Sequence, residues 1–62
     1  MTGKQIKDIR LAKSLTQTEF AKKIGVSKTT ICLWENDIKK PSIKNTKNIV
    51  TFCKRNKIKV VI

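Results

Sequence analysis

The side chains of this 62-residue sequence that could do chemistry are mostly cationic. Fifteen Lys and Arg stand against four Asp and Glu, which gives a formal net charge of +11 at pH 7. Histidine, the commonest general base and metal ligand, is absent. The four carboxylates are scattered, and none forms a nucleophile-like pair with Ser or Thr. This composition argues against an enzyme and favours a protein that binds a polyanion.

The two cysteines, Cys32 and Cys53, lie 21 positions apart with no CxxC pair in the sequence. This spacing is typical neither of a zinc site nor of a secreted disulfide framework, so we expect two reduced thiols, no metal and no cofactor. The longest apolar run, Ile31-Cys32-Leu33-Trp34, is too short for a membrane span or a signal peptide. The sequence therefore predicts a cytoplasmic protein with no membrane partner.

The apolar spacing and the helix caps predict an all-α fold of four, at most five, short helices in one domain over 1–62. Ile6 and Ile9 recur at helical spacing and predict a first helix over 4–13. A last helix is expected over about 43–55, because apolar residues again share one face there. Such a small domain has room for a core but not for an enclosed active-site cleft.

The middle of the sequence predicts two short helices joined by a tight turn. The Thr16 hydroxyl and the Glu19 carboxylate have the spacing of a capping box, in which each satisfies a backbone N–H donor. Gly25 is expected to end the helix that starts there, in a left-handed conformation. Ser27 is a natural N-cap for the next helix. Two helices with this short connection form a helix-turn-helix, here over 17–35.

These residues resemble the helix-turn-helix family of phage repressors and Cro proteins. The matching positions are Ile6, Ile9-Arg10, Leu15-Thr16-Gln17, Glu19-Phe20-Ala21, Ile24-Gly25-Val26-Ser27, Ile31, Trp34-Glu35 and Pro41-Ser42. Asp37 replaces a glycine of the family, in a turn that Asp tolerates, and Thr46 replaces a core leucine. The family's usual fifth helix and any second domain are missing. The resemblance implies a Cro-type or minimal repressor of a phage or mobile element in a bacterial host.

The second helix of a helix-turn-helix, here predicted over 28–35, lies in the major groove of double-stranded DNA. Its outward side chains are then available to base edges. Lys28 suits guanine O6 and N7, Thr29 suits a thymine methyl or a hydrogen bond, and Leu33 is expected to be exposed and to contact a thymine methyl. The predicted base contacts are Ser27, Lys28, Thr29, Thr30, Cys32 and Leu33.

A second set of residues is expected to contact phosphates, which position the protein without reading sequence. Gln17 stands at the N-terminus of the first of the two helices, where backbone N–H groups favour an anion. The other residues of the set follow the helix predicted over 28–35. Each lysine taken alone is equally consistent with a solvated surface. The predicted phosphate contacts are Gln17, Asn36, Lys39, Lys40 and Lys44. The resemblance also implies a structural, partly buried ion pair between Arg10 and Glu35.

One domain of this size reads about half a site, so we expect a weak homodimer that assembles mainly on a two-fold operator. The tail, residues 57–62, alternates like a strand, and an isolated strand must pair or pack somewhere. Ile58, Val60 and Ile62 are candidates for the dimer interface, with packing on the chain's own core or disorder as alternatives. Another class of function also stays open, a small antirepressor that binds a repressor partner through Cys32 and Leu33.

Overall fold

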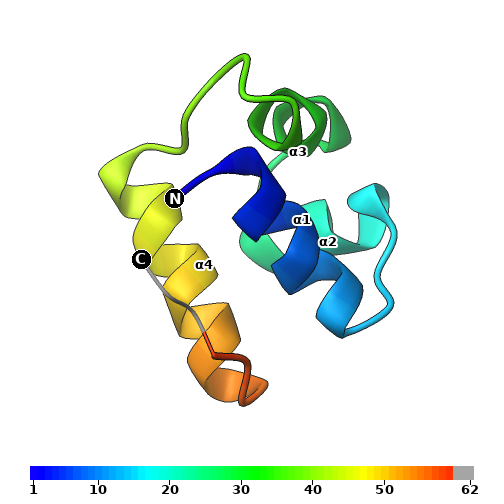
Figure 1. The fold of residues 1–62 in the computed structure, drawn as a ribbon, viewed down its shortest axis with the longest axis vertical. Coiled ribbons are helices and arrows are strands. Elements are labelled where there is room, and N and C mark those ends of the chain that lie inside the picture. Colours follow the sequence, from blue (N-terminus) through cyan, green and yellow to red (C-terminus); the bar gives the residue numbers. More distant parts are fainter. Residues whose placement is uncertain (60–62) are drawn as a thin grey trace.

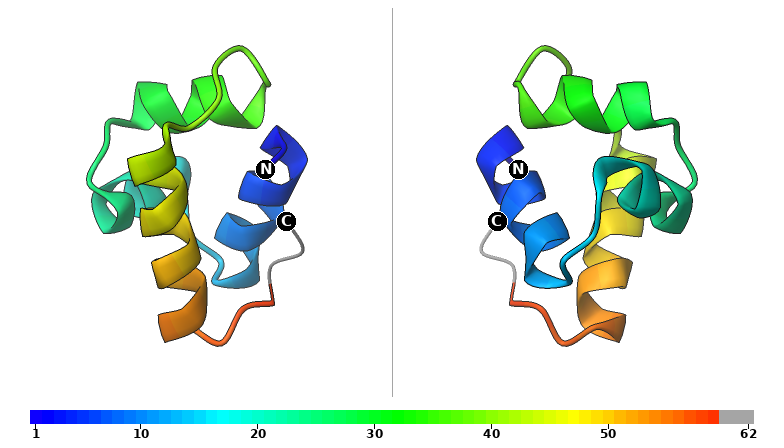
Figure 2. Two further views of the ribbon diagram at one scale, coloured as in Figure 1. Left: turned by 90° about the vertical axis from the view of Figure 1, so that its left-hand side faces the viewer. Right: turned by 90° about the vertical axis from the view of Figure 1, so that its right-hand side faces the viewer.

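The computed structural model describes residues 1–59 of the chain, and that part is built from four helices. They are α1 (Gly3–Ala12), α2 (Gln17–Ile24), α3 (Lys28–Glu35) and α4 (Ile43–Arg55). α3 packs against α1 and α2, and α4 packs against α2. α3 lies across one end of the molecule, and α4 runs from that end toward the opposite one (Figure 1 and Figure 2). The all-α prediction is confirmed, since these described residues contain no strand.

Each of these helices begins at a hydroxyl-bearing N-cap. The cap oxygen accepts a hydrogen bond from the backbone N–H three residues later, at 3.1 to 3.2 Å, in Thr2, Thr16, Ser27 and Ser42. The predicted capping box of α2 is present, because the N–H of Thr16 donates to Oε1 of Glu19 at 2.8 Å. Each cap contributes about 1 kcal/mol, which matters in a domain of this size.

α1 begins and ends one residue earlier than the predicted range, 4–13. Thr2 and Gln5 form a capping box in which the N–H of Thr2 donates to Oε1 of Gln5 at 2.7 Å. Glutamine serves in this motif as glutamate does. The predicted range was based on the apolar residues, and the first of these in α1, Ile6, lies one turn after the cap at Thr2.

Apolar side chains from all four helices form the core of the described residues. Its buried members are Ile6, Ile9, Phe20, Ala21, Ile24, Ile31, Trp34, Ile49, Phe52 and Cys53. Phe20 and Phe52 meet edge to face with ring centroids 5.4 Å apart, which stabilises the α2–α4 contact beyond simple area burial. Ile58 packs half-buried against this core, and its N–H donates to the carbonyl of Cys53 at 2.9 Å. Val60 and Ile62 lie outside the described residues.

The turns on both sides of α3 use left-handed residues. Gly25 ends α2 with a φ of 89°, as the predicted turn requires. Asp37 follows α3 with a φ of 57°, so this turn tolerates the replacement of the family's glycine. The Asp37 carboxylate also accepts a hydrogen bond from the N–H of Gly3 at 2.9 Å. Asp37 therefore both makes the turn and satisfies an N-terminal donor of α1.

The start of α1 lies against the end of α3, backbone to backbone (Figure 2). A Cβ atom on Gly3 would lie 2.5 Å from the carbonyl oxygen of Glu35 and 2.6 Å from that of Trp34, closer than real Cβ atoms approach. Glycine is the residue that permits so close an approach. Gly3 thereby sets how near α1 comes to the C-terminal end of the recognition helix.

Candidate nucleic-acid interface

The recognition helix α3 has an inward and an outward face. Ile31 and Trp34 are buried in the core, with 0% and 4% of their surface exposed. Lys28 and Thr29 are exposed, and the next residues on their side, 32 and 33, are half-buried. Positions one, two, five and six of a helix share a face. The structure thus brings four of the predicted base-contacting residues to one side of α3.

Ser27 and Thr30, also predicted to contact bases, build the start of the same helix. The N–H of Thr30 donates to Oγ of Ser27 at 3.2 Å, and the two hydroxyl oxygens lie 2.9 Å apart. This pair satisfies donors of the first turn of α3. The hydroxyl of Ser27 therefore caps α3 directly before Lys28, its first outward-facing residue.

Leu33 is half-buried, so the expectation of an exposed side chain is wrong. The chain after α3 folds back on this residue, because the N–H groups of Ile38 and Lys39 both donate to its carbonyl oxygen, at 3.0 and 3.3 Å. Cys32 is half-buried as well, and Nδ2 of Asn36 donates to its carbonyl at 2.8 Å. The outward face of α3 is consequently more polar than predicted.

Behind α3, one cluster of polar side chains ties three helices together. Nε and Nη2 of Arg10 donate to the two carboxylate oxygens of Glu35, at 2.7 and 3.0 Å. Nη1 of Arg10 donates to the carbonyl of Leu15 at 2.8 Å, and Nε2 of Gln17 donates to Oε1 of Glu35 at 3.2 Å. The side chains of Arg10 and Glu35 are only 11% and 5% exposed. This two-pronged pair joins α1 and the start of α2 to the last residue of α3.

The pKa values within this cluster follow from its geometry. Burial would raise the pKa of Glu35, but hydrogen bonds from Arg10 and Gln17 and the charge of Arg10 outweigh burial, so the pKa is lowered. The hydrogen bond to Glu35 raises the pKa of Arg10. In α2, the backbone N–H and the hydroxyl of Thr16 lower the pKa of Glu19. Glu35 is therefore held as a carboxylate that faces a cation.

We expect the folded protein to lose stability in acid. Because the pKa of Glu35 is lower in the folded chain, its contribution is complete above the ordinary value of 4.5 and is lost as the pH falls through the folded-state value. Urea unfolding followed by circular dichroism should give a lower midpoint at about pH 3 than at about pH 6. Glu35→Gln should be less stable near neutral pH but should lose less on acidification. Equal losses in both proteins would contradict the assignment to Glu35.

The predicted phosphate-contacting residues come from the end of α3, the α3–α4 loop and the first turns of α2 and α4. Lys39 and Lys40 lie in the exposed α3–α4 loop, and Lys44 lies in the first turn of α4. Asn36 is the C-cap of α3 and is exposed. Gln17 joins this group from the start of α2, because its amide contacts Glu35, the residue before Asn36. The chain that carries Lys39 and Lys40 returns to α3, since the N–H of Lys39 donates to the carbonyl of Leu33 at 3.3 Å.

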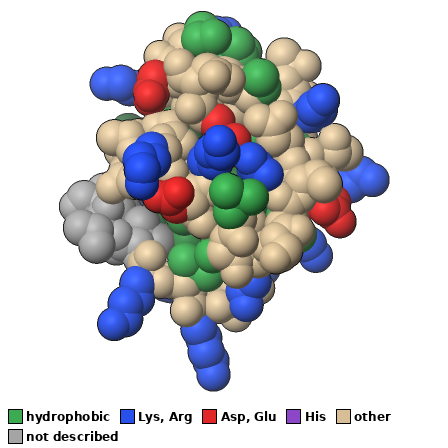
Figure 3. Space-filling model, turned by 45° about the vertical axis from the view of Figure 1, so that its right-hand side comes forward, with side chains coloured by type: hydrophobic (Ala, Val, Ile, Leu, Met, Phe, Trp, Pro, Cys, Tyr) green, Lys and Arg blue, Asp and Glu red, His purple; other side chains and the backbone are tan. Residues whose placement is uncertain are grey.

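The charged residues are unevenly distributed along the chain. All four Asp and Glu lie between residues 8 and 37, whereas residues 38–62 carry eight Lys and Arg and no acid. Figure 3 shows Lys and Arg side chains projecting around the outline of one face of the molecule. The excess of positive charge attracts polyanions, and charge alone does not single out α3.

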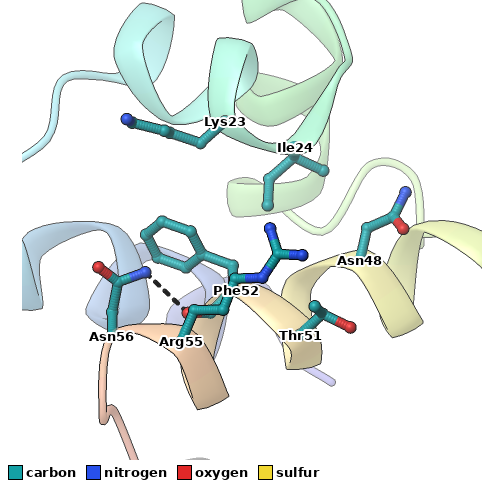
Figure 4. A pocket seen from close by; sticks show the side chains of 7 residues that line it. All are labelled: Lys23, Ile24, Asn48, Thr51, Phe52, Arg55 and Asn56. Carbon is teal, nitrogen blue, oxygen red and sulfur yellow. Dashed lines mark hydrogen bonds between the residues drawn. The ribbon is translucent and has the colours of Figure 1, made fainter.

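A groove of about 420 Å³ between α2 and α4 was not identified from the sequence. Its lining, shown in Figure 4, consists of Lys23, Ile24, Asn48, Thr51, Phe52, Arg55 and Asn56. These residues come from two helices that are distant in the sequence, so no local sequence motif predicts the groove.

The remaining chemistry of residues 1–59 is limited. In this part of the chain no three His, Cys, Asp or Glu are grouped to hold a metal ion. None of its helices has the length and apolar character to span a bilayer. Both cysteines are free thiols, and burial raises the pKa of Cys53.

A family model described as "Helix-turn-helix" matches residues 6–56 of the chain. The match extends from the first buried isoleucine of α1 to the C-cap of α4, and it includes every predicted DNA contact and the Arg10–Glu35 pair. No curated protein and no solved structure is significantly similar to the chain.

Proposed function

Because this chain belongs to the helix-turn-helix family of the phage-repressor and Cro type, we propose that it is a sequence-specific repressor of transcription. Family membership supports a DNA-binding regulator. The proposal adds that a dimer binds a two-fold operator with each α3 in the major groove, and that it represses by excluding polymerase. It further assigns the protein to the cytoplasm of a bacterium that carries a phage or mobile element.

The observation that carries this proposal is the outward face of α3 with a cationic loop after it. Lys28 and Thr29 project from the first turn of α3, the part of a recognition helix that meets base edges. We expect Lys39 and Lys40, which are exposed in the α3–α4 loop, to contact the flanking phosphates. The proposal thus assigns the reading of the base sequence to Lys28 and Thr29. It assigns sequence-independent binding of phosphates to the lysines of the α3–α4 loop.

The size of the molecule supports two copies on one operator. Its principal extents are 27 × 21 × 19 Å. Half-sites one DNA turn apart have centres about 34 Å from each other, so two copies fit side by side on one face of the duplex. The candidate interface residues remain Ile58, Val60 and Ile62. Ile58 is half-buried on its own core and offers a partner only part of its side chain.

Selection of binding duplexes from a random DNA pool tests the proposal. The selected duplex should be palindromic and should bind at least about 10³-fold more tightly than random DNA in anisotropy titrations. Titration at two salt concentrations should give a log–log slope near −7 if the dimer makes about eight phosphate contacts. Binding that is unselective and salt-labile would contradict a repressor and favour the antirepressor, whose partner a pull-down would seek.

Two alanine substitutions should separate base reading from phosphate binding. Lys28→Ala removes a group that suits guanine, so it should weaken operator binding by about 1–2 kcal/mol and relax specificity at that base pair. Lys40→Ala removes a phosphate contact, so it should weaken binding to all duplexes alike and reduce the salt slope by about one per protomer. Anisotropy titrations against the operator and against random DNA measure both effects. Identical profiles for the two variants would contradict this division.

A further inference from the structure

The groove between α2 and α4 is separate from the proposed DNA-binding face. It is lined by the end of α2 and by α4 from Asn48 onward, whereas the predicted DNA contacts Gln17 and Lys44 lie in the first turns of these helices. At a rise of 1.5 Å per residue, Asn48 and Arg55 lie about 6 and 16 Å along α4 from Lys44. This end of α4 points away from α3 (Figure 1 and Figure 2). A ligand in the groove and a duplex on α3 can therefore be bound together.

The groove combines cationic walls with a small apolar floor. Lys23 on α2 and Arg55 on α4 are exposed, and neither forms an ion pair within residues 1–59. The guanidinium of Arg55 extends across the groove toward α2 (Figure 4). Between the helices, Ile24 and Phe52 keep 7% and 9% of their surface exposed. A ligand with acidic and apolar groups in alternation matches this arrangement.

The polar part of the lining is suited to a peptide backbone. Asn48 and Thr51 stand on α4 beside Arg55, and Asn56 is held in place because its Nδ2 donates to the carbonyl of Phe52 at 2.8 Å. Amide and hydroxyl side chains can both donate to carbonyl groups and accept from N–H groups. Among the described residues, none that lines the groove is acidic, and the nearest negative charge to Lys23 on α2 is that of Glu19, one turn earlier.

We propose that this groove docks an acidic segment of a partner protein. The segment carries two carboxylates, which pair with Lys23 and Arg55, and an apolar side chain between them, which covers Ile24 and Phe52. This docking goes beyond DNA binding, since it lets a DNA-bound protein hold a second protein on its opposite side. The inference does not depend on the identity of the operator.

Duplex DNA is the other polyanion that the charge of this surface could attract, and the shape of the groove argues against it. A duplex presents a convex backbone, whereas a groove of about 420 Å³ between two helices admits single side chains and a peptide strand. Phosphates and sugars would also gain little from the apolar floor.

A matched pair of double variants tests the docking site. The probe is a fluorescein-labelled nine-residue peptide with one Phe between flanking Glu residues, titrated with the full chain and followed by anisotropy. Lys23→Gln with Arg55→Gln should weaken binding on the order of tenfold, because two ion pairs are lost. The control, Lys22→Gln with Lys54→Gln, removes the same charge from neighbouring positions that do not line the groove, and it should weaken binding less than about twofold.

Further measurements decide between the groove and general charge attraction. Circular dichroism should show that both variants are folded, and Thr51→Phe, which fills the groove without changing the charge, should also weaken binding. Equal weakening by the two double variants would overturn the proposal in favour of non-specific attraction. Displacement of the peptide from the wild-type chain by a saturating duplex would overturn it in favour of a nucleic-acid surface. Failure of the proposed repressor function would appear instead in the duplex selection.

Discussion

Replacing Glu35 by alanine should remove a large part of the protein's folding free energy at 25 °C. The substitution leaves the guanidinium of Arg10 without its carboxylate partner and removes the acceptor of the Gln17 amide. Loss of one member of a buried pair costs about 3–5 kcal/mol. A chain of 62 residues has a total stability of roughly 3–9 kcal/mol, so the cost is comparable with the whole. Urea unfolding followed by circular dichroism measures the change.

Two further variants show whether burial of the pair is the cause. Asp8→Ala removes the exposed pair with Lys4, whose side chains are 84% and 59% exposed for Lys4 and Asp8, and it should change stability by less than about 0.5 kcal/mol. Replacing Arg10 by methionine together with Glu35 by leucine should recover much of the loss, because no buried charge is then left unpaired. Similar costs for Glu35→Ala and Asp8→Ala would refute the structural role of the pair.

Replacing Gly3 by alanine should destabilise the protein although the position is helical. In an unobstructed helix, alanine is favoured over glycine by roughly 0.5–1 kcal/mol. Here the new Cβ would meet the carbonyl oxygens of Glu35 and Trp34 at 2.5 and 2.6 Å, and both atoms belong to the backbone. Overpacking of this kind costs up to about 3 kcal/mol, which reverses the usual sign. Denaturant midpoints of the two proteins give the difference.

Gly25 provides a control for this prediction, because glycine is favoured at position 25 for a different reason. A Cβ on Gly25 would meet no atom within 4 Å, but φ is 89°, so alanine there should cost about 1–2 kcal/mol through backbone strain alone. Asparagine tolerates left-handed backbone, so Gly25→Asn should be milder than Gly25→Ala. Gly3→Asn should be at least as harmful as Gly3→Ala. A raised midpoint for Gly3→Ala would show that α1 and α3 separate at little cost.

Local signals account for the parts of the fold that could be predicted. The capping residues Thr16 and Ser27 and the glycine at 25 act within a few residues of themselves, so they predicted the ends of α2 and the start of α3. α4 also occupies its predicted range, which followed from apolar residues that share one face, and Ser42 caps it in the structure. The family pattern added what no local signal gives, the expectation that Arg10 and Glu35 meet across 25 positions.

The unpredicted features depend on distances between segments far apart in the chain. In the sequence, Gly3 looks like an ordinary residue at a helix start. Its close approach to the backbone of α3 is seen only in the folded structure. Asp37 was expected only to tolerate a turn, and its bond to the N–H of Gly3 spans 34 positions. Helical spacing does not specify the partial burial of Leu33 or the return of the following loop to its carbonyl oxygen. The groove beside Arg55 exists only once α2 and α4 are assembled.

The two faces of α3 are made by separate sets of residues. Ile31, Trp34 and Glu35 carry the packing and the ion pair, whereas Lys28 and Thr29 project outward and have no part in either. We therefore expect substitutions at 28 and 29 to cost little folding free energy. Under the proposed function, the DNA target could then change while the architecture stays constant.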